Sequence, residues 1–317
     1  MTTCPTTAPG EPQRLEALRR LHLINSPVEE RFERITRVAK RVLQVEITAL
    51  SLIDDDQQFF KSIQGLDVRS TPRDRAFCAH TILSSDPFVV EDATKDPRFA
   101  DNPLVTGEPG IRAYAGIPLE SADGQRIGAL CAIHGRPRTF SKFDLLTLTD
   151  LAHIAESELR HSDRRSITAD FRAALSIEQR AQYIDPITQT WNQRATRELI
   201  DRHVGDPGFN ASGAALIKID LDAFSAVNQQ HGEAAANEAI SEAARRMLSA
   251  VRADDAFGRL EDDNFIALIP RCPDARQAET IATRLLNELI QLPVITQHAA
   301  IDLAASVGGV FIPQDQP

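Results

Sequence analysis

The sequence has no excess of basic residues. Its 35 lysines and arginines are outnumbered by 45 aspartates and glutamates, and the formal net charge is −10 at pH 7. Neither end carries a basic tail, and no stretch forms a basic stripe. Because nucleic acids are bound largely by neutralising their phosphates, we expect no nucleic-acid partner.

Long apolar runs and paired cysteines are also missing. No segment approaches the about 20 apolar residues that span a bilayer, and the polar start of the chain lacks the pattern of a secretion signal. The four cysteines, Cys4, Cys78, Cys131 and Cys272, show no pair spacing and indicate free thiols in a reducing compartment. The sequence therefore predicts a cytoplasmic protein without membrane contact. Its 317 residues are enough for two domains, each with its own core.

An acidic cluster lies between two apolar stretches in the second half. Glu261-Asp262-Asp263-Asn264 is followed by an apolar run that ends at Pro270, which predicts two short strands joined by a hairpin. Upstream, residues 214–222 form an apolar strand ending in Asp220 and Asp222, and residues 234–250 have helical spacing. This order would bring Asp220 close to Asp263. The acidic tip is either a place for a divalent cation or a nucleotide phosphate, or a solvated turn.

Four motifs between residue 185 and the end of the chain resemble those of the GGDEF domain, the diguanylate cyclase family. They are residues 185–194 (DPITQTWNQR), 220–224 (DLDAF), 228–237, and 261–265 at the position of the signature. The resemblance implies a nucleotidyl-cyclase-like α/β sandwich with Mg²⁺ held by Asp220 and Asp263. It also implies that Asp263 is the general base if the domain is active. The positions that would contact GTP are Asn228, Asn237, Glu261, Asp262 and Asn264.

Several of these positions depart from the family pattern. The two glycines that admit the GTP phosphates are replaced by Glu261 and Asp262, whose side chains obstruct the approach. Each also adds a negative charge, which costs about 1 kcal/mol at ~4 Å from a phosphate charge in water. Asn264 replaces the usual Glu, Ser225 a phosphate-binding Lys, and Asn237 an Asp that would offer guanine two acceptors.

The end of the chain adds to the departures. Residues 305–310 resemble a late strand of the family, but the basic helix and final strand that follow it in the family are missing, because the sequence stops at Pro317. Either the sequence is cut there or the domain is naturally short. From the replacements and this shortening we expect a degenerate GGDEF domain without a working catalytic residue.

One feature of the family is intact. Arg252 and Asp255 form the Arg-x-x-Asp pair that ends five residues before the signature, and Arg284 matches a secondary arginine. The resemblance implies a binding site for cyclic di-GMP. An arginine fork can bond guanine or a phosphate, and a carboxylate can accept from the guanine N–H edge. Alternatively, Arg252 and Asp255 are a surface ion pair worth less than about 1 kcal/mol.

The first half predicts an α+β sensor-type fold. Helical spacing at residues 15–23 and 32–43 is followed by strand patterns at 47–53, 88–90, 113–119 and 127–133, with Asp123-Gly124 as a hairpin turn. The stretches 77–80 (FCAH), 90–93 (VEDA), 96–99 (DPRF), 114–119 (YAGIPL) and 127–131 (IGALC) resemble a GAF domain across residues 14–160. That resemblance implies an antiparallel sheet flanked by helices and an unidentified small-molecule ligand.

Four residues are candidates for the pocket of this domain: Cys78, His80, Tyr114 and Cys131. Cys78 and His80 leave several hypotheses open, namely covalent attachment of a bilin, metal binding, or a thiol switch with Cys131. The alternative to all three is that these side chains belong to an ordinary core, where free cysteine is common.

We expect residues 1–13 to be disordered and residues 161–184 to form a helical linker. Ser141 caps a helix whose apolar positions recur at three- and four-residue steps from Leu145 to Leu159. This long helix either pairs two chains as a coiled coil, giving a homodimer through the linker and the GAF domain, or packs on its own domain.

Three functions remain. The leading hypothesis is a GAF–GGDEF signalling protein without cyclase activity that binds cyclic di-GMP, or a protein partner, under the control of a GAF ligand. The second is an active diguanylate cyclase that condenses two GTP across a homodimer. The third is a partner-binding scaffold that needs no nucleotide.

Overall fold

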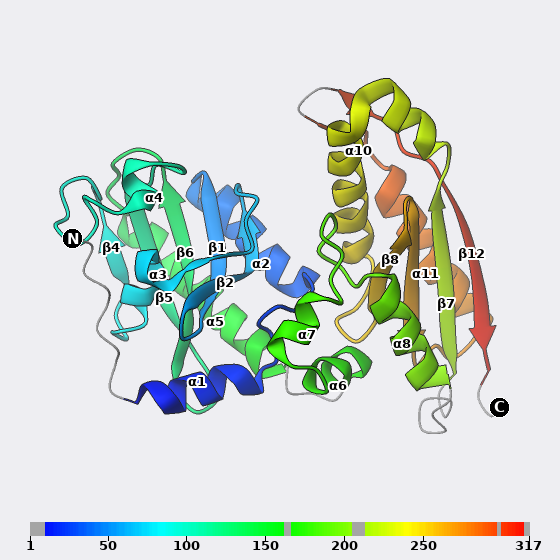
Figure 1. The fold of residues 1–317 in the computed structure, drawn as a ribbon, viewed down its shortest axis with the longest axis horizontal. Coiled ribbons are helices and arrows are strands. Elements are labelled where there is room, and N and C mark those ends of the chain that lie inside the picture. The colour runs from blue at the N-terminus through cyan, green and yellow to red at the C-terminus, as the bar shows by residue number, and fades with distance from the viewer. Residues whose placement is uncertain (1–9, 162–165, 205–212, 297–298, 314–317) are drawn as a thin grey trace. The chain divides into compact units, whose positions relative to one another are not determined.

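The computed structural model describes residues 10–161, 166–204, 213–296 and 299–313. Within them the chain divides into two compact units, Met1–Arg164 and Arg165–Pro317, each with its own sheet (Figure 1). Both units combine antiparallel strands with helices, which confirms the predicted α+β class.

The first unit is built on a six-stranded antiparallel sheet in the order β3-β2-β1-β6-β5-β4. The strands are β1 (Ile47–Ile53), β2 (Gln57–Gln64), β3 (Ser70–Pro72), β4 (Phe88–Val90), β5 (Ala113–Glu120) and β6 (Arg126–His134). The helices are α1 (Glu11–Arg20), α2 (Glu30–Leu43), α3 (Phe77–Thr81), α4 (Pro103–Thr106) and α5 (Lys142–His161). The four predicted strands are confirmed. Gly124 has the left-handed φ of 72° that its turn between β5 and β6 requires.

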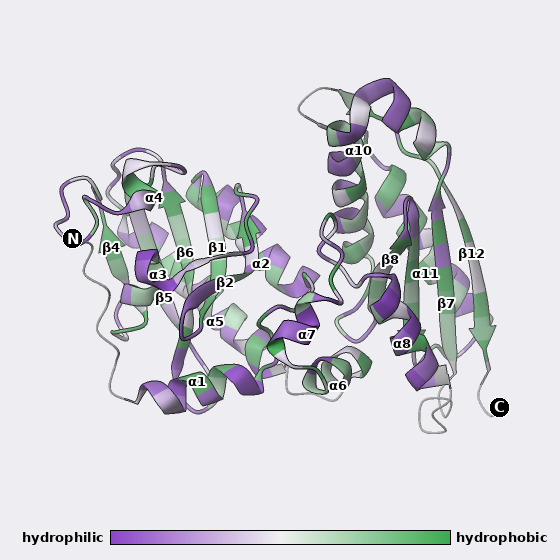
Figure 2. Ribbon diagram, viewed as in Figure 1, coloured by the Kyte–Doolittle hydropathy of each residue, from purple (hydrophilic) through white to green (hydrophobic). Residues whose placement is uncertain are grey.

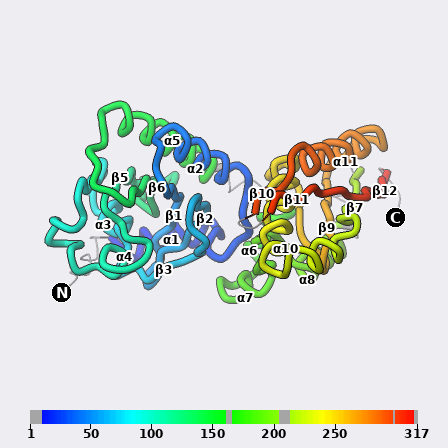
Figure 3. The backbone as a smooth tube through the Cα atoms, turned by 90° about the horizontal axis from the view of Figure 1, so that it is seen from above, coloured from blue at the N-terminus to red at the C-terminus, as the bar shows by residue number. Residues whose placement is uncertain are grey.

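Helices cover both faces of this sheet. α2 and α5 pack on each other and on one face, and α3 and α4 lie on the other (Figures 1 and 3). Successive residues of β1 point to opposite faces of the sheet. Since helices cover both faces, every residue of the strand from Ile47 to Ile53 is buried. This explains its nearly continuous apolar sequence, which Figure 2 shows along the central strands.

The second unit has a four-stranded antiparallel sheet in the order β12-β7-β9-β8. The strands are β7 (Ala214–Leu221), β8 (Ala256–Glu261), β9 (Asn264–Pro270) and β12 (Ala305–Ile312), with a separate short pair, β10 (Val294–Ile295) and β11 (Ala300–Ile301). The helices are α6 (Ile167–Ala173), α7 (Ile177–Ala181), α8 (Gln193–Val204), α10 (Phe224–Ser249) and α11 (Ala275–Ile290). α11 packs against β7 and β12, and α8 packs against β8 from the opposite face (Figure 3).

The segment expected to be a continuous helical linker is different in the structure. Its described part consists of two short helices, α6 and α7, because Ser166 and Ser176 each cap a new helix by accepting a backbone N–H. Residues 162–165 lie outside the described residues, as do residues 1–9 of the predicted disordered start. Residues 11–13, also expected to be disordered, form the first turn of α1, where Pro12 suits the first helical positions.

Candidate functional site

The acidic cluster forms the tip of the hairpin between β8 and β9, as predicted. Asp262 adopts a left-handed conformation with φ of 45°, which aspartate tolerates better than most residues. β9 pairs with β7 so that Asn264 stands opposite Asp220, and the Leu221 N–H donates to the Asp263 carbonyl at 3.2 Å. The predicted approach of the Asp220 strand end to the Asp263 turn is therefore confirmed.

The loop that carries the first motif, residues 185–194, contacts β8 through Trp191. The Arg259 N–H donates to the Trp191 carbonyl at 2.8 Å, and Trp191 bridges to Gly258 in parallel register. A Cβ atom on Gly258 would lie 2.5 Å from that carbonyl oxygen. A residue without a side chain is therefore required at position 258 for this loop to reach the hairpin strand.

A single arginine joins the loop to the hairpin tip. The Nε and Nη2 atoms of Arg259 donate to the Asp262 carbonyl at 2.8 and 2.6 Å, and its Nη1 lies 3.4 Å from both carboxylate oxygens of Asp185. The Asp185 carboxylate in turn accepts from the N–H groups of Ile187 and Thr188. Sequence reasoning missed this role, although an arginine two residues before the cluster was visible.

The tip offers oxygen atoms of the kind that a hard cation prefers, and a metal site here stays a prediction. Asp220 and Asp263 supply carboxylates, and the buried Oδ1 of Asn264 has no hydrogen-bond partner among the described residues. Such oxygens suit Mg²⁺, which would supply positive charge for bound phosphates. No group of three or more His, Cys, Asp or Glu side chains in the described parts of the chain could hold a metal ion. Water or phosphate would therefore complete the coordination.

The other positions implied for GTP lie on α10 and at the tip. Asn228 is exposed on the first segment of α10, and Asn237 is half-buried beyond a kink at Gly232, whose φ is 82°. Glu261 and Asp262 are exposed at the hairpin. Their charges therefore face any anion that approaches the tip, as the sequence predicts.

The Arg252–Asp255 pair forms a closed turn just before β8. The Arg252 N–H donates to Asp255 Oδ2 at 2.7 Å, and the Asp255 N–H donates to the Arg252 carbonyl at 3.1 Å. Asp255 is only 8% exposed, and burial raises the pKa of its carboxyl to about 6. The exposed Arg252 side chain makes no ion pair within the part of the chain that the structure describes. The charge of Arg252 nevertheless lowers the pKa of Asp255 against the larger effect of burial, so the two residues interact through the backbone hydrogen bond and through their charges.

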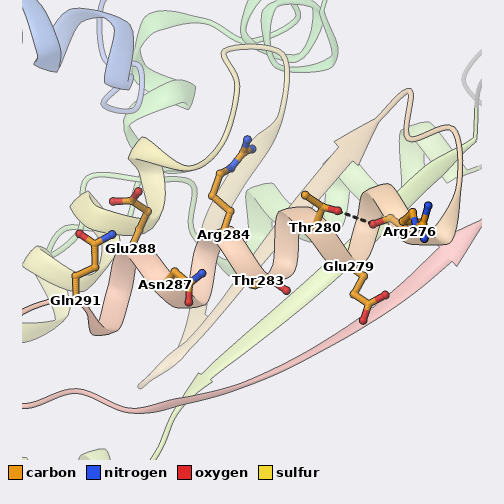
Figure 4. Close-up of a pocket in the computed structure, with 8 residues that line it drawn as sticks. All are labelled: Arg276, Glu279, Thr280, Thr283, Arg284, Asn287, Glu288 and Gln291. Atoms are coloured by element: carbon orange, nitrogen blue, oxygen red, sulfur yellow. Dashed lines mark hydrogen bonds between the residues drawn. The ribbon is translucent and has the colours of Figure 1, made fainter.

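Arg284 faces the same turn from α11. Figure 4 shows its side chain extending from the helix toward the loop between α10 and β8, and its charge lowers the pKa of Asp255 against the larger effect of burial. A shallow groove of about 560 Å³ follows this face of α11. Its lining residues are Arg276, Glu279, Thr280, Thr283, Arg284, Asn287, Glu288 and Gln291. The structure thus brings Arg252, Asp255 and Arg284 together.

Three of the four pocket candidates in the first unit meet in its core. The Cys78 and Cys131 sulfur atoms are 3.7 Å apart, and the Tyr114 hydroxyl lies 3.2 Å from Cys78 Sγ. His80 is half-buried at the edge, stacked on Phe88, and burial lowers its pKa. Aromatic rings pack closely around the group, so its role in ligand binding stays a prediction.

Comparison with protein families identifies both units. Residues 27–159 match the GAF domain, and residues 182–317 match the family described as diguanylate cyclase, GGDEF domain. The chain is a GAF domain followed by a GGDEF domain. The two resemblances drawn from the sequence are thereby confirmed.

Curated relatives that the chain matches are longer than the chain. A cyclic di-GMP phosphodiesterase of Pseudomonas aeruginosa is 32% identical over 295 residues, which are 92% of this chain and 46% of that protein. The probable diguanylate cyclase DgcE of Escherichia coli is 38% identical over 63% of this chain and 15% of its own length. The chain thus spans less than half of these curated relatives.

Among solved structures, a sensory box/GGDEF family protein from Caulobacter crescentus is 32% identical over 42% of this chain and 85% of that one, with a TM-score of 0.36. None of the helices in the described residues combines the length and the apolar character that crossing a membrane requires.

Proposed function

We propose that the GGDEF domain of this protein is a receptor for cyclic di-GMP and that the GAF domain regulates its signalling output. The site consists of Arg252, Asp255 and Arg284. The observation that carries the proposal is the turn in which the Asp255 carboxylate accepts the Arg252 N–H, while the exposed Arg252 side chain has no ion pair within 4.0 Å among the described residues.

This arrangement suits a guanine nucleotide with a phosphodiester. Two arginines offer forked donors to guanine O6 and N7 or to phosphate oxygens. The second carboxylate oxygen of Asp255 can accept from the guanine N–H edge. The neighbouring Asp254 does not compete for Arg252, because it forms an ion pair with Arg271. Relatives named for the synthesis and the breakdown of cyclic di-GMP support the choice of ligand.

Calorimetric titration of cyclic di-GMP into the full chain tests the proposal. We expect micromolar binding by the wild-type protein and a roughly 10- to 100-fold loss in Arg252→Ala, because charge-assisted hydrogen bonds contribute about 1.5–3 kcal/mol. Arg284→Ala should weaken binding similarly. Arg276→Ala is the matched control, since Arg276 lines the same groove on α11, eight residues or about 12 Å before Arg284.

Two results would reject the receptor. The first is no heat of binding with the wild-type protein. The second is an equal loss of affinity in Arg276→Ala and Arg252→Ala, which would indicate that cyclic di-GMP is attracted to any positive charge on this face.

Within this proposal the hairpin does not catalyse. Glu261 and Asp262 place two negative charges at the tip where GTP phosphates would lie, and Ser225 offers no cation. Incubation with GTP and Mg²⁺ should therefore yield no cyclic di-GMP. Turnover by the wild-type protein, abolished in Asp263→Ala, would establish the cyclase instead.

We further propose that the protein acts as a homodimer through the GAF domain. Phe143, Leu146 and Ile154 are exposed on α5 at helical spacing, and Val38 and Val42 are exposed on the adjoining α2. A second copy would remove this apolar surface from water. Sedimentation should show a dimer that Leu146→Glu weakens and Lys95→Glu, on an exposed loop, does not. A wild-type monomer at all concentrations would refute it.

A further inference from the structure

Two thiols meet in the core of the GAF domain without forming a bond. Cys78 lies on the five-residue helix α3 and Cys131 on the central strand β6, and their sulfur atoms are 3.7 Å apart. Both are buried and free. They face each other directly, although 53 residues separate them in the sequence.

Hydroxyl groups surround the Cys78 sulfur. The Tyr114 hydroxyl donates to Cys78 Sγ at 3.2 Å and lies 2.7 Å from the hydroxyl of Thr81. Hydrogen bonding with Cys131, and then with Ser51 and Tyr114, lowers the pKa of Cys78, although burial opposes it. The hydrogen bond to Cys78, together with burial, raises the pKa of Cys131 well above its usual range. Because the Tyr114 hydroxyl donates to the Cys78 sulfur, the geometry favours the thiolate on Cys78.

We propose that Cys78 and Cys131 form a redox-active dithiol that hydrogen peroxide oxidises to a disulfide within the GAF domain. The Cys78 thiolate attacks one peroxide oxygen, which breaks the O–O bond, forms a sulfenic acid and releases hydroxide. The Cys131 sulfur then displaces the hydroxyl group and forms the S–S bond. Two thiols lose two electrons, and one peroxide becomes two waters. This step is independent of any nucleotide bound by the GGDEF domain.

The local structure determines which sulfur moves. A disulfide requires about 2.05 Å between sulfur atoms, so the pair must close by roughly 1.6 Å. Cys131 is held between two strands, opposite Ala49 and Gly116. The short helix α3 therefore shifts toward the sheet. It also carries Phe77, which is stacked on Phe99 at 3.9 Å between ring centroids, so oxidation rearranges the aromatic core.

Peptide mapping of the full-length wild-type chain tests the dithiol. The protein is treated with hydrogen peroxide, alkylated, digested without reductant and analysed by mass spectrometry. We expect one cross-linked pair containing Cys78 and Cys131, two hydrogens lighter than the separate peptides and split again by dithiothreitol. Cys4 and Cys272 should be found as alkylated thiols.

Two variants assign the roles of the sulfurs. In Cys131→Ser, Cys78 should stop at the sulfenic acid, which dimedone traps. Cys272→Ser is the matched control, because Cys272 is also buried but has its sulfur near the Asp274 carbonyl, and this variant should keep the cross-link. Circular dichroism checks that both variants fold. The peptide mapping of the wild-type chain tests the proposal even if a variant does not fold.

The dithiol would be overturned if peroxide left both cysteines free to alkylate in unfolded protein. Conversion of Cys78 to sulfinic acid without a cross-link would overturn it equally, because the two sulfurs would then not react with each other. A disulfide from either cysteine to Cys4 or Cys272 in place of the expected pair would have the same meaning.

Discussion

Replacing Asp255 by asparagine should stabilise the GGDEF domain and weaken its binding of cyclic di-GMP. Burial raises the pKa of Asp255 from 3.8 to about 6, so the folded protein binds a proton more tightly than the unfolded chain. A raised carboxyl pKa means that stability falls as the pH rises from about 4 to about 6 and stays at the lower level above that range. The shift of about 2 units corresponds to about 3 kcal/mol at neutral pH.

Asparagine removes this cost and keeps the local hydrogen bond. Its Oδ1 atom can accept the Arg252 N–H that Asp255 Oδ2 accepts now at 2.7 Å. We expect Asp255→Asn to raise the free energy of unfolding by about 2–3 kcal/mol at pH 8 and by much less near about pH 4.5, where the folded wild-type carboxyl is protonated. Binding should fall, because the amide replaces one acceptor by a donor facing the guanine N–H edge.

Urea unfolding followed by tryptophan fluorescence measures this effect. The single tryptophan, Trp191, is buried in the GGDEF domain and reports on that unit. Asp254→Asn is the matched control, since Asp254 lies in an exposed ion pair with Arg271 and should change stability by less than about 1 kcal/mol. An equal difference between wild type and Asp255→Asn at both pH values would refute the reasoning, as would a less stable variant at pH 8.

Three further substitutions test how the hairpin is held. Arg259→Met should cost about 1–3 kcal/mol in urea unfolding, because the Asp262 carbonyl and the Asp185 carboxylate both lose the hydrogen bonds from Arg259. An unchanged urea midpoint would show that Arg259 does not hold the loop to the hairpin tip. Gly258→Ala should cost at least as much, since its Cβ would lie 2.5 Å from the Trp191 carbonyl. Asp262→Gly should stay within about 1 kcal/mol of wild type, because relief of the left-handed φ is offset by a freer unfolded chain; a larger loss would assign the Asp262 side chain a structural role.

The strands with a strong local signal were predictable, whereas β2 and β3 of the first sheet were not predicted. The central strand β1 is apolar except for Thr48 and Ser51, and the hairpin strands β8 and β9 flank a polar turn, so the hydrophobic pattern places them. The linker was not predictable in the same way. Apolar positions continue at helical steps through residues 167–183, but Ser166 and Ser176 satisfy backbone N–H groups and start new helices.

The candidate site was likewise predictable in part. The resemblance to the GGDEF family indicates the motif positions of Arg252, Asp255, Asp220 and Asp263 from the sequence alone. What spacing does not give is the partner of each polar atom. The bond from Asp255 to a backbone amide and the closeness of Cys78 to Cys131 depend on tertiary packing. A sequence pattern therefore indicates which residues gather, and the fold decides which of their donors and acceptors remain available.

The hairpin tip shows how a backbone shape can persist while its chemistry changes. A glycine is expected where Asp262 stands, and Asp262 still adopts the left-handed conformation that glycine favours. Arg259 compensates by donating two hydrogen bonds to the Asp262 carbonyl. The turn is therefore retained, while its surface gains the charges of Glu261 and Asp262. Two negative charges at the tip disfavour a bound phosphate, which agrees with the proposal that the hairpin does not catalyse.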